Sequence, residues 1–174
     1  MHDVIKIALI GVTGVSAITD LYSRRIPNVV VVAGFLAGIA LNSWLNGWNG
    51  LAQAAMGFGL AVLIYVPLFL LRAMGGGDVK LMAAAGAILG PRDWFTLFIL
   101  ASIAGGVIAL GMVLARNALG SAFFNVMHIA KELAYFRAPY KSQPDLDISS
   151  PQSLSMPHGV AIAIGAVALL ILQL

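Results

Sequence analysis

Apolar residues in this chain form six long, nearly uncharged runs, and short polar turns separate most of them. The runs cover residues 4–20, 28–45, 51–71, 78–90, 94–115 and 159–172. A helix of about 20 apolar residues crosses the roughly 30 Å hydrocarbon core of a bilayer. The pattern therefore predicts an all-α, polytopic membrane protein with about six transmembrane helices, folded as a single membrane-embedded domain over residues 1–174.

Composition agrees with this prediction and excludes several classes of site. Hydrophobic residues make up 60% of the chain and charged residues 10%, with a mean hydropathy of +0.95, whereas a soluble domain carries about 25% charge. A water-soluble fold is therefore excluded. The chain has no cysteine, which excludes disulfides, thiolate metal sites and a cysteine nucleophile.

The first run resembles a signal peptide in length but not in its flanks. Asp3 and Lys6 lie at its start, and it leads into the charged turn at residues 22–25 rather than into a small-residue cleavage site. We expect it to be retained as the first helix. Pro27 ends the turn, because proline cannot continue a helix.

The fourth run is shorter than the others. Its 13 residues would rise only about 20 Å as a helix, and the glycines at positions 75–77 precede it. Short or interrupted helices in membranes tend to line cavities, because irregular backbone needs protein or water around it. The stretch 75–78 is therefore a candidate site.

The long polar connection, residues 116–156, begins with a helical pattern. From about 118 to 136 the apolar residues lie on one helical face: Leu119, Ala122, Phe123, Val126, Met127, Ala130 and Leu133. This predicts an amphipathic helix in the membrane interface, with an ordinary connecting loop as the alternative. Residues 138–157 contain four prolines and predict a loose linker.

Basic residues predict the orientation of the chain. Six crossings place eight Lys and Arg residues on one side and two, Lys6 and Arg92, on the other. By the positive-inside rule the side with eight faces the cytoplasm. Both termini should then be extracytoplasmic, and the turns beside Asp20 and Asp78 should be cytoplasmic.

Asp20 and Asp78 differ from the other acidic residues, which lie in termini and loops. Both lie at helix boundaries on the same predicted face. An aspartate within the bilayer costs about 2.5 to 3.5 kcal/mol on insertion scales, so a functional role is the default. The alternative is a pair of structural ion pairs, Asp20 with Arg24 and Asp78 with Lys80.

Two carboxyls brought together in a poorly solvated cleft hold one shared proton near neutral pH. The ionised member can take a proton from water while the protonated member polarises a scissile carbonyl. Glycines at 75–77 would let a substrate backbone approach closely. The pair therefore suits hydrolysis without a covalent intermediate.

Two motifs resemble those of a known family. The segment from Asp20 to Asn28 (Asp-Leu-Tyr-Ser-Arg-Arg-Ile-Pro-Asn) resembles the first aspartate motif of type IV prepilin peptidases, especially the short form of the Flp, or tight-adherence, pilus. Residues 75–81 resemble their GxGD signature, shared with other intramembrane aspartyl proteases, and Pro157, His158 and Gly159 resemble the start of their last helix.

The resemblance implies a bacterial inner-membrane aspartic endopeptidase. It would remove the leader from a prepilin or pseudopilin, after a glycine at the cytoplasmic face and just before the hydrophobic helix of the subunit. Asp20 and Asp78 would be catalytic. The supporting positions would be Gly75, Gly77, Lys80, Arg25, Pro27, Asn28, Pro157, His158 and Gly159, with Lys80 and Arg25 in orienting or pairing roles and no cofactor.

The chain departs from the family in two ways. Longer members carry an N-terminal cytoplasmic region associated with methylating the new pilin terminus, which makes methyltransferase activity doubtful here. Position 158 is histidine where an aromatic residue such as tyrosine is expected. His158 is either a titrating neighbour of the aspartates or a polar residue that starts a helix.

Other functions remain open at this stage. No spacing of His, Asp or Glu predicts a metal site, and no motif predicts nucleic-acid binding. A small cation transporter or channel would also place aspartates on broken helices. A non-catalytic membrane subunit of a pilus or secretion machine is a third possibility.

Overall fold

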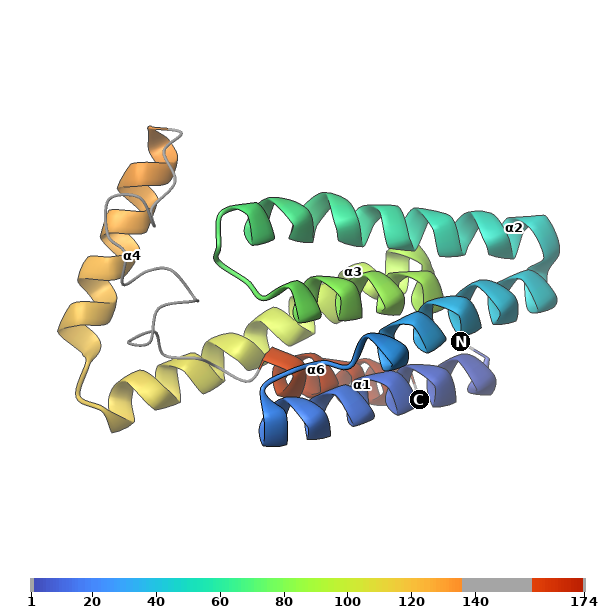
Figure 1. Cartoon of the computed structure of the whole chain (residues 1–174), viewed down its shortest axis with the longest axis horizontal. Helices are drawn as coiled ribbons and strands as arrows, with labels where there is room; N and C mark the ends of the chain where they lie inside the picture. The colour runs from blue at the N-terminus through green and yellow to red at the C-terminus, as the bar shows by residue number, and fades with distance from the viewer. Residues whose placement is uncertain (1, 136–157, 174) are drawn as a thin grey trace.

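The computed structural model describes residues 2–135 and 158–173, and within these ranges the chain is helical, without strands. In chain order the helices are α1 (Asp3–Ser23), α2 (Asn28–Leu70), α3 (Gly76–Ala115), α4 (Leu119–Ala134) and α6 (His158–Leu172) (Figure 1). By length and composition, α1, α2 and α3 are each apolar enough to cross a membrane, and α6 is a shorter apolar helix. The predicted all-α class is confirmed.

Helices α2 and α3 each fold back on themselves. The backbone leaves helical geometry at Gly47 (φ 56°) and at Gly90 (φ 74°), where a positive φ favours glycine. The indole N–H of Trp94 donates to the carbonyl of Met82 at 2.9 Å, although residues 12 apart would be about 18 Å apart along a straight helix. Each helix is therefore a hairpin of two antiparallel halves (Figure 1).

The reversal at Gly47 falls in a predicted turn and the one at Gly90 falls on the last residue of the fourth run, and the six apolar runs are helical apart from these breaks. Asn42, which is buried, joins the hairpins. Its side-chain amide donates to the carbonyls of Ala87 and Ile88 at 3.1 and 2.9 Å. How many of the six helical segments cross the membrane stays a prediction.

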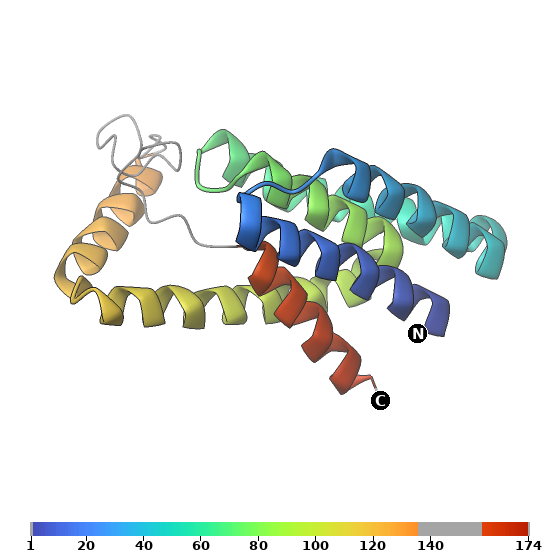
Figure 2. The ribbon, with the colours of Figure 1, turned by 60° about the horizontal axis from the view of Figure 1, so that its bottom comes forward.

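The first half of α3, residues 76–89, occupies the centre of the bundle. All side chains from Leu81 to Ile88 are buried. Its small residues allow backbones to meet closely: a Cβ on Gly86 would lie 2.4 Å from the carbonyl oxygen of Gly57. Close packing of small residues is a common way for membrane helices to associate. Helix α1 packs against the first half of α2, and α6 packs against α1 and α3 (Figure 2).

Helix α4 projects away from the bundle as an arm (Figures 1 and 2). A turn with Asn117 in the left-handed region (φ 52°) separates it from α3. The chain is helical over Leu119–Ala134, within the range predicted over 118–136, and Phe123, Val126 and Met127 are exposed. Its location in the membrane interface stays a prediction. The linker predicted over 138–157 lies outside the described residues.

Candidate active site

The candidate site lies where three helix ends meet. The end of α1 carries Asp20, the start of α3 carries Asp78, and the start of α6 carries His158 and Gly159. The end of α1 lies beside the start of α6 in both views (Figures 1 and 2). The fold thus brings Asp20 together with Asp78, 58 positions later in the chain, and with Gly159, 139 positions later.

Asp20 is half-buried in the last turn of α1. The backbone N–H of Gly159 donates to its Oδ2 at 2.9 Å. A Cβ at position 159 would lie 3.0 Å from Oδ2 and 3.1 Å from the Cβ of Asp20. Glycine is therefore the residue that lets the start of α6 approach this carboxyl closely enough to bind it.

Asp78 is also half-buried, in the first turn of α3. Gly75 precedes the helix as its N-cap, and its backbone N–H donates to the Asp78 carboxylate. A side chain that reaches back from the third helical residue to the N-cap amide is a known way of satisfying a helix start. Asp78 interacts electrostatically with Asp20 and His158, so the three groups form one cluster.

The supporting positions surround this cluster. The Lys80 ammonium donates to the side-chain oxygen of Asn28 at 3.1 Å. It thereby bonds α3 to the start of α2, where Pro27 is the N-cap, instead of pairing with Asp78 as one alternative had it. Together Asn28 and Lys80 line an apolar cavity of about 340 Å³.

The other supporting positions have less specific surroundings. A Cβ on Gly77 would lie 3.3 Å from the Cβ of Ile26, so Gly77 packs against the turn after α1. Arg25 is exposed in that turn. Pro157 lies outside the described residues.

Tyr65 is a site residue that the sequence analysis missed. It is buried, contacts the rings of Trp94 and Phe98 edge-on, and interacts electrostatically with Asp78. It lies inside the third apolar run with no polar neighbour in sequence, so no local pattern marks it. The turn at residues 71–75 places it near Asp78, because this turn lays the second half of α2 antiparallel to the first half of α3, where Gly57 contacts Gly86.

No group of three or more His, Asp, Glu or Cys side chains that could hold a metal ion occurs among the residues that the structure describes. What the cluster offers is two carboxyls, an imidazole and two backbone amides at a helix-end junction. Such a set can exchange protons with a bound water and polarise a carbonyl.

Comparison with known proteins identifies the family. The model of the type IV leader peptidase family matches residues 7–110, which include both aspartates. The chain belongs to this family. The family match and the apolar helices together indicate a multi-pass bacterial membrane protein.

Two curated relatives of this chain are named prepilin leader peptidase/N-methyltransferase. The Bacillus subtilis (strain 168) protein is 32% identical over 111 residues, 62% of this chain and 44% of the relative. The Myxococcus xanthus (strain DK1622) protein is 31% identical over 110 residues, 60% of this chain and 33% of the relative. The matched segments thus span less than half the length of either relative. No solved structure matches.

Proposed function

We propose that this chain is an aspartic endopeptidase that removes leader peptides from prepilins or pseudopilins. The observation that supports it best is the helix-end cluster, in which Asp78 interacts electrostatically with Asp20 while the Gly159 amide donates to Asp20. Both motifs of the sequence analysis contribute to this one cluster. Family membership supplies the reaction class, and the names of the relatives supply the substrate class.

In the proposed reaction the two carboxyls share one proton. The ionised carboxyl takes a proton from a water molecule, whose oxygen attacks the scissile carbonyl carbon, and the protonated carboxyl donates to the carbonyl oxygen. The tetrahedral intermediate then collapses, the C–N bond breaks, and the amine leaves with a proton returned from the dyad. No covalent bond to the enzyme forms at any step.

The backbone amides of Gly75 and Gly159 orient the carboxyls in this scheme. Each donates to one aspartate, which fixes the rotamer of that side chain and leaves its other oxygen for the water or the carbonyl. Lys80 and Asn28 hold the start of α2 against α3 next to Asp78. They therefore act as positioning residues, without touching the reacting atoms.

The main test replaces each aspartate with its amide. Asp20→Asn and Asp78→Asn should each lower leader cleavage about a thousandfold or more, because an amide can neither accept the proton from water nor share one. The double variant should lose no more than either single one, since residues that act as a unit are not additive. The measurement is the shift of a candidate prepilin on a gel after incubation with membranes.

Two controls accompany this test. Asp93→Asn changes an acid of α3 that lies just beyond the reversal at Gly90, and it should leave cleavage within about twofold. The absence of cysteine also allows Asp20→Cys with Asp78→Cys to be joined by a short thiol cross-linker without background. Substantial cleavage by either Asn variant would refute the aspartic mechanism. Failure of cross-linking in folded protein would favour separate cation sites, as in a transporter.

We also propose that the six helical segments make six membrane crossings, with the cluster facing the cytoplasm and both termini outside it. The basic residues support this orientation, because eight of ten fall on the side of Asp20 and Asp78. Reporter fusions at Leu174 and near Ser142 should show opposite sidedness. The same sidedness at both positions would contradict six crossings and the inner-membrane orientation that depends on them.

A further inference from the structure

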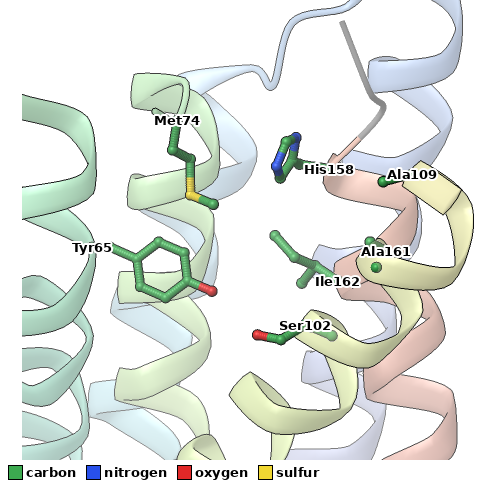
Figure 3. A pocket seen from close by; sticks show the side chains of 10 residues that line it. Tyr65, Met74, Ser102, Ala109, His158, Ala161 and Ile162 are labelled. Atoms are coloured by element: carbon green, nitrogen blue, oxygen red, sulfur yellow. The ribbon is translucent and has the colours of Figure 1, made fainter. Parts of the chain in front are cut away.

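The cavity of about 340 Å³ between α2 and the first half of α3, here called the Lys80 cavity, has no part in the proposed reaction. Asn28 and Lys80 line it together with six apolar residues: Val31, Val32, Phe35, Phe58, Ala83 and Ala84. A second cavity, of about 300 Å³, belongs to the candidate active site, where Tyr65 and His158 project into the same space (Figure 3). The two cavities share no lining residue, so the Lys80 cavity is a separate feature of the fold.

The Lys80 cavity has a polar end and an apolar interior. Asn28 and Lys80 are the first lining residues of α2 and α3, and their side chains are bonded to each other at 3.1 Å. Farther along, the rings of Phe35 and Phe58 pack with their centroids 5.0 Å apart. The helix rises about 10 Å between Asn28 and Phe35. Over this length the lining changes from polar to apolar, as a phospholipid does from its headgroup to its acyl chains.

The Lys80 cavity opens toward the outer surface of the bundle. Val32 lines it and is 53% exposed, and Val29 and Leu36 beside it on α2 are also exposed. Exposed apolar side chains that gather on one surface are typical of contact with a membrane or a partner. Because α2 is long and apolar enough to cross a membrane, a molecule in the bilayer can enter the cavity from the side.

The polar end of the Lys80 cavity carries a positive charge that can bind a ligand. An ammonium group has three N–H donors, and the side-chain oxygen of Asn28 accepts from that of Lys80, which is exposed. The nearby acid Asp78 accepts from the backbone N–H of Gly75 and belongs to the aspartate cluster. Basic pockets between membrane helices are typical binding sites for anionic headgroups.

The volume of the Lys80 cavity favours an acyl chain over a helix. One turn of α-helix, about 10 Å across and 5.4 Å long, fills roughly 400 Å³, which is more than the cavity holds. An acyl chain carries no side groups and is much narrower. The small side chains of Ala83 and Ala84, both buried, leave room for such a chain against α3.

We propose that the Lys80 cavity binds an anionic phospholipid, with the phosphate on Lys80 and Asn28 and one acyl chain along Val31, Val32 and Phe35. The proposal requires that the protein lies in a membrane, but not that it is a peptidase. A lipid held by Lys80 and Asn28 would strengthen the junction of α2 with α3. Since it binds the folded protein, it would also stabilise the fold.

The test of the headgroup contact measures phospholipid binding to the purified chain by native mass spectrometry. Phosphatidylglycerol and phosphatidylcholine with the same acyl chains are titrated separately. The wild-type protein should bind phosphatidylglycerol about fivefold more tightly, the effect expected of one lysine near anionic headgroups. Lys80→Gln should remove this preference, and Lys80→Arg should restore most of it. Arg25→Gln removes an exposed charge outside the cavity and should leave the preference within about twofold.

The test of the acyl-chain contact fills the apolar part of the Lys80 cavity. In Val32→Trp a large ring enters from an exposed position, so the cavity closes without a clash inside the bundle. This variant should lose the tightly bound phosphatidylglycerol. Val15→Trp is the matched control, because Val15 is 45% exposed on α1 and lines neither cavity. It should keep the affinity within about twofold.

Several outcomes would overturn the lipid site. Equal affinity of the wild-type protein for the two lipids, or an unchanged preference in Lys80→Gln, would exclude the headgroup contact. An equal response of Val32→Trp and Val15→Trp would mean that lipids surround the bundle without a specific site.

A different occupant would overturn it as well. If Val32→Trp abolishes binding of a synthetic hydrophobic pilin helix and leaves phosphatidylglycerol bound, the cavity is a groove for a protein helix. If it converts a dimer into a monomer, the occupant is a second copy of the chain. None of these measurements involves cleavage, so the lipid site can fail while the peptidase proposal stands, and the reverse also holds.

Discussion

The first half of α3 and the whole of α4 are both short helices, yet their surroundings are opposite. In the first half of α3, residues 76–89, every side chain from Leu81 to Ile88 is buried. In α4, Phe123 is 65% exposed and Phe124 is 74% exposed. One helix is enclosed by the rest of the bundle, and the other extends from it as an arm (Figure 1).

The cause of this difference lies in side-chain size and pattern. The centre of the first α3 segment is a run of alanines and one glycine over 83–87, apolar on every side, which is typical of a buried helix. Such small residues let the backbone of α2 come into direct contact with the backbone of α3. In α4 larger apolar residues alternate with polar ones, and among the described residues Phe123, Phe124 and Val126 stay exposed.

The two helices differ in how firmly the rest of the fold holds them in position. Asp78 lies on the enclosed helix, whose centre is buried on all sides, and the catalytic role that we propose for Asp78 needs such a rigid support. Among the residues that the structure describes, α4 has few contacts outside its junction with α3. Segments with few buried contacts open at low free energy, so we expect α4 to take its position from its surroundings.

The largest effect should come from adding one carbon to the enclosed helix. Gly86→Ala would place a Cβ 2.4 Å from the carbonyl oxygen and 2.7 Å from the carbonyl carbon of Gly57. Both are backbone atoms that cannot rotate away, so the hairpins must separate. We expect a loss of roughly 2 to 3 kcal/mol in the free energy of unfolding, measured by equilibrium unfolding in mixed detergent micelles.

The same substitution on the arm is its matched control. Gly120 of α4 has no atom within 4 Å of a built Cβ, so Gly120→Ala should be neutral or should stabilise the helix by at most about 1 kcal/mol. Gly86→Ala should thus destabilise the protein, whereas Gly120→Ala should not. An equal response at both positions would mean that the contact between Gly57 and Gly86 does not hold the hairpins together.

The features that could be predicted from the sequence are those that depend on neighbouring residues. The apolar runs predict the six helical segments, and the breaks between runs, at Gly47 and directly after Gly90, predict where α2 and α3 reverse, because a break in helical pattern depends on adjacent residues. The helix over 119–134 followed from its apolar stripe. The motifs around Asp20 and Asp78 indicated the two aspartates because each motif is continuous in sequence.

What the sequence did not show depends on contacts between distant segments. Tyr65 lies in an apolar run like any core residue, and its place beside Asp78 follows from the packing of the second half of α2 against the first half of α3. The bond from Gly159 to Asp20 spans 139 residues. Likewise, Lys80 was expected as a possible partner of Asp78 on spacing alone, but the packing of α2 against α3 offers it Asn28 instead.

Substitutions in α4 should have the smallest effect on folding and activity. Probes placed on α4 should nevertheless differ clearly in how strongly lipids quench them. If α4 lies in the interface, its apolar face enters the acyl region and its other face stays in water. Phe123 and Ser121 are both exposed and are 200° apart around the helix, given 100° per residue. A probe on Phe123→Cys should therefore be quenched by brominated lipids several times more strongly than one on Ser121→Cys, while each variant keeps cleavage within about twofold and stability within about 0.5 kcal/mol.

Equal quenching at the two positions would show that α4 does not lie on the bilayer by its apolar face. A large loss of cleavage with Phe123→Cys, but not with Ser121→Cys, would instead mean that the apolar face of the arm contacts the substrate or the bundle during catalysis, and the contrast between the enclosed helix and the exposed one would then hold only for the resting enzyme.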